Sequence, residues 1–152
     1  MPGKQILRSL LLLSLLFLRG ATLQAQDFIE RNLWYNEEKT AKIQIYKASD
    51  NKFYGKVVWL KVPDLDGKPK TDVHNPDKSK RNDPIMGLLL LKGFKKDGEK
   101  EYSDGTIYDP KNGKTYKCKI TAKEDKLDVH GYVGFSWIGR TTVWTKAETL
   151  NP

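Results

Sequence analysis

The chain has 152 residues, with 27 Lys or Arg against 19 Asp or Glu and a formal net charge of +8. This length allows one domain, and a single cysteine, Cys118, excludes an intrachain disulfide. The basic residues are interspersed and not clustered beside aromatic residues, so we expect no nucleic-acid partner.

The first 25 residues have the pattern of a bacterial secretory signal. Lys4 and Arg8 precede the apolar run 10–18, and Leu23-Gln24-Ala25 forms a cleavage site. A helix of that run would be about 13 Å long against roughly 30 Å of hydrocarbon, so we expect no membrane span. The sequence predicts a signal peptide over 1–25, export to the periplasm, and a single domain over 26–152. Removal of the signal peptide would leave 24 basic and 19 acidic residues, because three of the 27 basic residues precede Gln26.

The first half of the domain contains segments with the apolar alternation of strands. In one of them Gly55 shares a side with Phe53, Val57 and Trp59, where a glycine relieves crowding in a strongly bent sheet. A later apolar run predicts a strand buried on both faces. The segments are 33–35, 41–46, 53–60 and 85–94.

The C-terminal third predicts consecutive hairpins. From Ser103 to Lys146, four alternating runs are separated by tight turns at 109–113, 123–126 and 136–139. Together with the first half this gives about eight strands. We therefore predict an all-β fold, an antiparallel up-and-down meander that closes into a barrel. Eight strands leave room inside a barrel for side chains or one small ligand.

The segment 61–84 interrupts this rhythm with four prolines and charges of both signs. It is too long for a plain connection, so it is either disordered or functional. Asn75-Pro76 and Asp83-Pro84 favour two turns and a defined path. We expect it to fold over the open end of the barrel, with Asn75 and Arg81 acting as a clamp.

The residues show no pattern of a catalytic or metal site. Motifs of serine hydrolases, phosphate-binding loops, dinucleotide folds and zinc proteases are absent from the sequence. His74 with Asp72 or Asp77 lacks metalloenzyme spacing, and the alternation around Cys118 predicts a buried small hydrophobe. We expect no enzymatic activity, no catalytic residue, no metal and no cofactor.

Several motifs together resemble a bacterial family of exported proteins, domain-of-unknown-function family 2147. They are the segment from Gly105 to Tyr116, Gly131-Tyr132-Val133-Gly134, and the segment from Gly139 to Lys146. The resemblance extends from about Trp34 to Lys146 and implies a small lipocalin-like barrel. The chain departs from the family pattern at its opening Asn32-Leu33-Trp34, at His130 and at Trp137.

A lipocalin-like barrel implies a pairing of Trp34 with Arg140. An early tryptophan would close one end, and a late basic residue would lie across its ring by a cation–π contact. The alternative is that Arg140 binds the anionic group of a ligand.

The leading functional hypothesis is non-enzymatic binding of a small apolar or amphipathic ligand by a monomer. Ordinary core packing is the alternative for each candidate side chain. The alternative function is a protein–protein interaction module of the cell envelope that uses the 61–84 loop. The candidate ligand-binding residues are Trp59, Tyr108, Tyr116, Tyr132 and Trp137.

Overall fold

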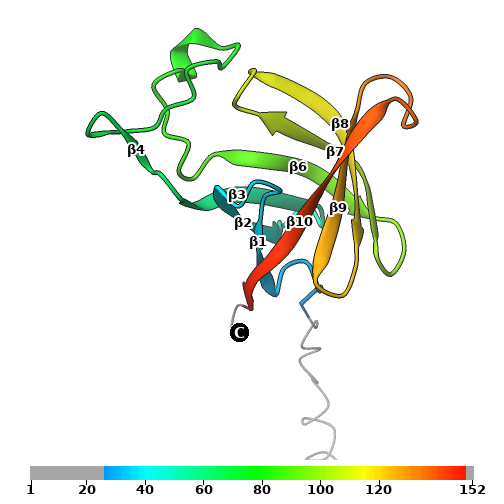
Figure 1. Cartoon of the computed structure of the whole chain (residues 1–152). Coiled ribbons are helices and arrows are strands. Elements are labelled where there is room, and N and C mark those ends of the chain that lie inside the picture. The colour runs from blue at the N-terminus through cyan, green and yellow to red at the C-terminus, as the bar shows by residue number, and fades with distance from the viewer. Residues whose placement is uncertain (1–25, 150–152) are drawn as a thin grey trace, which may run out of the picture.

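The computed structural model describes residues 26–149, and the predicted signal peptide lies outside the described residues. Eight antiparallel strands close into a barrel in the order β1-β10-β9-β8-β7-β6-β3-β2, as Figure 1 shows. The predicted all-β barrel is therefore confirmed. The barrel strands are β1 (Asn32–Tyr35), β2 (Ala41–Lys47), β3 (Phe53–Leu60), β6 (Leu89–Lys96), β7 (Glu101–Asp109), β8 (Lys114–Ala122), β9 (Lys126–Tyr132) and β10 (Gly139–Thr149).

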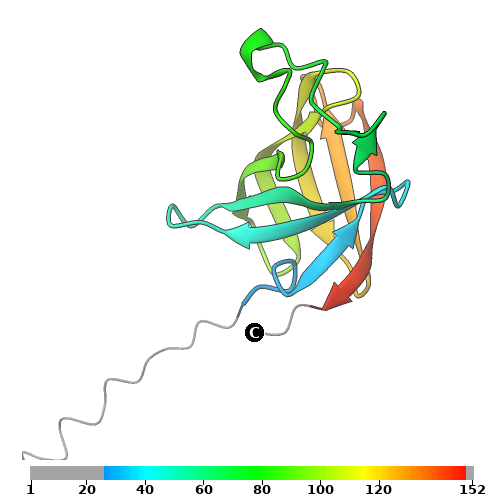
Figure 2. The ribbon, with the colours of Figure 1, turned by 90° about the vertical axis from the view of Figure 1, so that its left-hand side faces the viewer.

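The long segment between β3 and β6 has a defined path at one end of the barrel. It contains the small ribbon of β4 (Asp64–Leu65) and β5 (Lys68–Pro69), then the 3₁₀ turn η2 (Lys78–Lys80). Figures 1 and 2 both place this green segment at the end away from the C-terminus. Within residues 26–149, η2 is the only helical element, and no helix there is long and apolar enough to cross a membrane.

The strand predicted over 85–94 begins later than expected, at Leu89. Gly87 has a φ of +86°, a left-handed conformation that glycine adopts without steric cost. The Leu88 N–H donates to the Ile85 carbonyl at 3.0 Å, which closes a turn ahead of the strand. An apolar run alone does not distinguish such a turn from the strand that follows it.

Trp34 closes the end of the barrel opposite the long loop. Its ring is fully buried, its Nε1 donates to the Ile29 carbonyl at 2.9 Å, and Phe28 packs edge-on at 5.6 Å. The inward side chains above it fill the interior with Ile43, Phe53 and other apolar groups. This end is therefore a packed core.

The predicted contact between Trp34 and Arg140 is wrong. The partner of Trp34 on β10 is Lys146, whereas Arg140 lies opposite Gly131 of β9. Six residues of strand between 140 and 146 correspond to about 20 Å. Arg140 is at the other end of the barrel, its side chain is 80% exposed, and it forms an ion pair with Glu37 at 2.7 Å.

A β-bulge in β3 changes which side chains face inward. Lys42 lies opposite Trp59 while the next residue of β2, Ile43, lies opposite Val57, so Val58 is the extra residue. Up to Val57 the strand keeps its phase, and Gly55 faces inward where a Cβ would lie 2.8 Å from Leu91 Cδ1. The glycine prediction therefore fits the structure, but beyond the bulge the phase is reversed.

Candidate ligand-binding cavity

The open end of the barrel contains a cavity of about 1560 Å³. Side chains alternate between the two faces of each strand, so every second residue points into the barrel. Below the mouth these inward residues are apolar, and they form the walls of the cavity. Val57, Val129 and Trp144 are almost fully buried and form its deepest apolar surface. Further apolar lining comes from Leu60, Leu90, Ile107, Ile85 and Ala41. The barrel is therefore filled at the Trp34 end and hollow at the other.

Small residues leave the space that forms the cavity. Gly131 lies on β9 two residues after the inward Val129, and it lines the cavity. A Cβ there would meet Ile107 Cγ2 at 3.5 Å and Tyr116 Cβ at 3.7 Å, which are ordinary contact distances. Its φ is outside the left-handed region, so a larger side chain fits the backbone and would project into the cavity.

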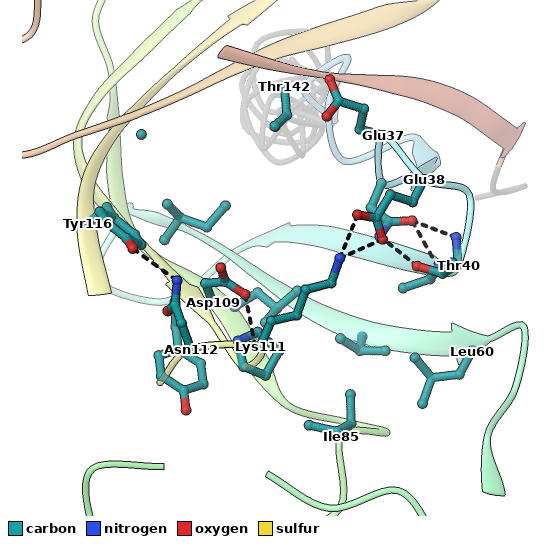
Figure 3. A pocket seen from close by; sticks show the side chains of 18 of the residues that line it. Glu37, Glu38, Thr40, Leu60, Ile85, Asp109, Lys111, Asn112, Tyr116 and Thr142 are labelled. Atoms are coloured by element: carbon teal, nitrogen blue, oxygen red, sulfur yellow. Dashed lines mark hydrogen bonds and ion pairs between the residues drawn. The ribbon is translucent and has the colours of Figure 1, made fainter. Parts of the chain in front are cut away.

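Charged side chains form a collar around the mouth, and Figure 3 shows part of it. Lys111 Nζ donates to both carboxylate oxygens of Glu38 at 2.5 and 2.6 Å, which connects the β7–β8 turn to the β1–β2 turn. Arg140 and Glu37 connect β10 to the same β1–β2 turn. Exposed ion pairs of this kind contribute little stability, so a ligand group can replace one partner at small cost.

A buried carboxylate anchors the long loop to the barrel. Asp72 is fully buried, accepts a hydrogen bond from the Tyr108 hydroxyl of β7 at 2.8 Å, and accepts another from Asn75 Nδ2 at 2.7 Å. Burial, then the bond to Asp72, raises the pKa of Tyr108 to about 12. The loop also lies against the β7–β8 turn, where a Cβ on Gly113 would be only 2.0 Å from the His74 carbonyl oxygen.

The predicted clamp residues hold the loop to itself. Arg81 Nε donates to the Asn75 carbonyl at 2.9 Å, and Asn75 in turn donates to Asp72. The bridge between Thr71 and Pro84 brings the two arms of the loop together. The contact with the barrel is made by Asp72. Sequence reasoning missed this role, since nothing along the chain pairs Asp72 with a tyrosine 36 residues later.

Three of the five predicted ligand-binding residues line the cavity, namely Tyr108, Tyr116 and Tyr132. Trp59 does not, because the bulge at Val58 turns it to the outer face, where its ring meets Tyr35 edge-on at 5.9 Å. Leu60 takes the inward position instead.

Trp137 is also absent from the cavity lining. It lies on the β9–β10 turn with 76% of its surface exposed. Sequence reasoning did not find the collar residues Glu37, Glu38 and Lys111 either. Their position at the tips of two turns is their only signal.

The described residues offer little for metal or thiol chemistry. Across 26–149, no three His, Cys, Asp or Glu side chains are grouped closely enough to hold a metal ion. Cys118 is fully buried, as the alternation around it predicts. Burial raises its pKa to about 12, so the reactive thiolate is scarce at neutral pH.

Comparison with known proteins places the barrel in a recognised group. The model of the family described as "Uncharacterized protein conserved in bacteria (DUF2147)" matches residues 32–146. No curated protein matches the chain. A similar solved structure is protein HP1028 from Helicobacter pylori, described as belonging to the lipocalin family, with 22% sequence identity and a TM-score of 0.67. The match covers 78% of this chain and 83% of that one. At this identity the likeness concerns the fold.

Proposed function

We propose that this chain, which belongs to the bacterial DUF2147 family, is a non-enzymatic binding protein for a small apolar or amphipathic ligand. The observation that carries the proposal is the cavity of about 1560 Å³, with apolar walls and a charged collar at its mouth. Binding sites for small molecules are concave and mostly apolar, with a few polar groups that fix orientation. The cavity has this composition.

The arrangement of the lining suggests how a ligand would lie. An apolar chain or ring would contact Leu60, Leu90 and Ile107, and displace water from them. Its polar end would remain at the collar, where Arg140 and Lys111 can donate to an anionic group in place of the glutamates that they contact now. Of the two roles that the sequence offers for Arg140, its position at the mouth favours the binding of a ligand's anionic group over contact with Trp34.

Titration with a fluorescent apolar probe tests the proposal. Gly131→Leu should reduce probe affinity by about tenfold or more, because the new side chain occupies the cavity. The matched control is Lys119→Leu, which adds the same side chain on the exposed face of the neighbouring strand. Equal probe affinity in all three proteins, or no binding to the wild type, would refute the cavity as a binding site.

We also propose that the protein acts in the periplasm as a monomer. The support is the signal pattern over residues 1–25 and the closed sheet, which leaves no barrel edge strand to pair with another chain. Export from a Gram-negative host should give an intact mass for a chain that starts at Gln26. A soluble product that retains residues 1–25 would contradict the localisation.

The interaction-module alternative has one observation in its favour. Val62, Leu65 and Val73 of the 61–84 loop are all more than half exposed. Val62 lies outside the cavity lining, so Val62→Ser should weaken partner binding in that case, yet leave probe affinity almost unchanged. A loss of probe affinity would instead assign the loop to the ligand site.

A further inference from the structure

Exposed apolar side chains are concentrated at the mouth of the cavity. Eight of the nine large apolar side chains that are exposed among residues 26–149 belong to the β3–β6 loop or the β9–β10 turn, which both border the mouth. The described turns at the Trp34 end have none. The eight are Val62, Leu65, Val73, Met86, Val133, Phe135, Trp137 and Ile138. An apolar surface at one end only is typical of a contact with another apolar phase.

The β9–β10 turn presents a rigid aromatic pair. The rings of Phe135 and Trp137 stack with centroids 4.5 Å apart and planes 9° from parallel, and both remain more than 60% exposed. The backbone beneath them is ordered, since Ile138 N–H donates to the Phe135 carbonyl at 3.0 Å and His130 Nε2 lies 2.7 Å from the Ser136 carbonyl oxygen. In Figure 1 this orange turn projects beyond the strands.

The two ends of the barrel also differ in net charge. The segments at the mouth (36–40, 61–87, 109–114 and 133–140) contain ten Lys or Arg and eight Asp or Glu. Those at the other end (26–31, 47–52, 95–101, 123–126 and 146–149) contain nine of each. The positive surplus therefore accompanies the apolar side chains, and it favours a negatively charged surface.

We propose that the open end of the barrel docks on an anionic phospholipid surface, with Phe135 and Trp137 inserted at the level of the headgroups. The indole of Trp137 has a polar N–H and favours this interfacial region, and Phe135 adds apolar area. The surplus of basic residues over the segments of the mouth adds attraction to anionic lipid. A protruding pair of rings fits insertion between lipids better than a flat protein interface. Docking does not depend on the proposed ligand binding. Only its purpose does, because an apolar ligand would then pass from lipid to cavity without crossing water.

Sedimentation with lipid vesicles tests the docking. The purified protein should sediment with vesicles of phosphatidylcholine and phosphatidylglycerol, and less with phosphatidylcholine alone. Phe135→Ser with Trp137→Ser should lower the partition coefficient by at least about tenfold. Val143→Ser, an exposed apolar position on β10, is the control and should change little. Equal sedimentation with both vesicle types would overturn the proposal, and so would equal partition coefficients of the double variant and the control. Absence of sedimentation would also overturn it and would favour a protein partner for the apolar mouth.

Quenching of tryptophan fluorescence by brominated lipids tests the inserted residue. Trp137→Phe should abolish the quenching, whereas Trp59→Phe, on the outer wall, should retain it. Quenching that persists in Trp137→Phe would contradict the insertion. Gly131→Leu, with its cavity filled, should still sediment with anionic vesicles, so a failure of docking and a failure of ligand binding give different results.

Discussion

The anchor between Tyr108 and Asp72 predicts how firmly the long loop is held over the cavity. Tyr108→Phe removes only the hydroxyl and leaves the ring in place. Asp72 then keeps Asn75 as a side-chain donor but loses the 2.8 Å bond from the barrel. Asp72 is fully buried, so water does not readily replace the lost donor. Loss of one hydrogen bond to such a group costs about 1 to 3 kcal/mol. The free energy of unfolding should fall by this amount in urea.

A matched control distinguishes this anchor from any tyrosine–aspartate pair. Tyr54 donates to Asp50 at 2.7 Å in the exposed β2–β3 turn. Tyr54→Phe removes a bond of the same chemistry, yet it should change stability little because both groups remain hydrated. Similar effects of the two substitutions would refute the reasoning, since burial would then not set the strength of the anchor.

Hydrogen exchange reports the loop directly. The Asp72 N–H donates to the Asp83 carbonyl at 2.9 Å and the Ile85 N–H to the Lys70 carbonyl at 2.8 Å, and both bonds hold the arms of the loop together. In Tyr108→Phe these two amides should exchange faster, while amides of β9 should keep their protection unless global stability changes them equally. Unchanged exchange at both loop amides would show that the anchor does not hold the loop.

The pH dependence of stability follows from the raised pKa of Tyr108. The folded protein retains the proton up to about pH 12, whereas the unfolded chain loses it near the ordinary value of 10. The contribution is therefore complete below pH 10 and is lost as the pH rises toward 12. The difference in stability between wild type and Tyr108→Phe should shrink over this interval, because the variant lacks the titrating group. A difference that stays constant from pH 9 to 12 would contradict this assignment.

Two further comparisons test the packing, both by thermal or urea unfolding. Trp34→Ala should destabilise the protein by about 3 to 5 kcal/mol, because it empties a fully buried site. Arg140→Ala should leave the melting temperature almost unchanged, because its ion pair is exposed. A larger loss of stability in Arg140→Ala than in Trp34→Ala would restore the predicted closure by Arg140. Gly105→Ala should destabilise the protein by about 1 to 3 kcal/mol, because its Cβ would lie 2.4 Å from atoms of the Phe94 ring. Gly131→Ala should change stability little. Equal effects of the two substitutions would contradict the packing described.

The sequence predicted the barrel because period-2 alternation and tight turns are local signals. Each hairpin of the meander is determined within about twenty residues, so the pattern from Ser103 to Lys146 could be interpreted without distant contacts. Trp59 was misplaced because the bulge at Val58 depends on how β3 pairs with β2, and a one-residue shift sends every later side chain to the opposite face. Trp34 and Arg140 were paired wrongly because the register of β1 on β10 is set by closure.

The candidate site was predictable only in part, for a related reason. Tyr116 lies on the inward face of β8, as alternation predicts. Tyr108 pairs with the exposed Thr115 and Tyr132 with the exposed Lys117, so alternation alone does not place these two in the cavity. The anchor at Asp72 and the collar of Glu37, Glu38 and Lys111 join residues that are between 36 and 103 positions distant from their partners. Such contacts exist only after the turns at one end of the barrel have been brought together.

The seam between β1 and β10 has a consequence for how the chain acquires its fold. Asn32 and Thr149 are Cα partners across that seam, so the last ladder to form joins positions 117 residues apart. Local hairpins form first, and the entropy lost in this final closure slows folding. The same adjacency makes the chain suited to circular permutation. A short linker across the seam, with new termini in the exposed segment near η2, would turn the slowest pairing into a local hairpin and keep every ladder of the barrel.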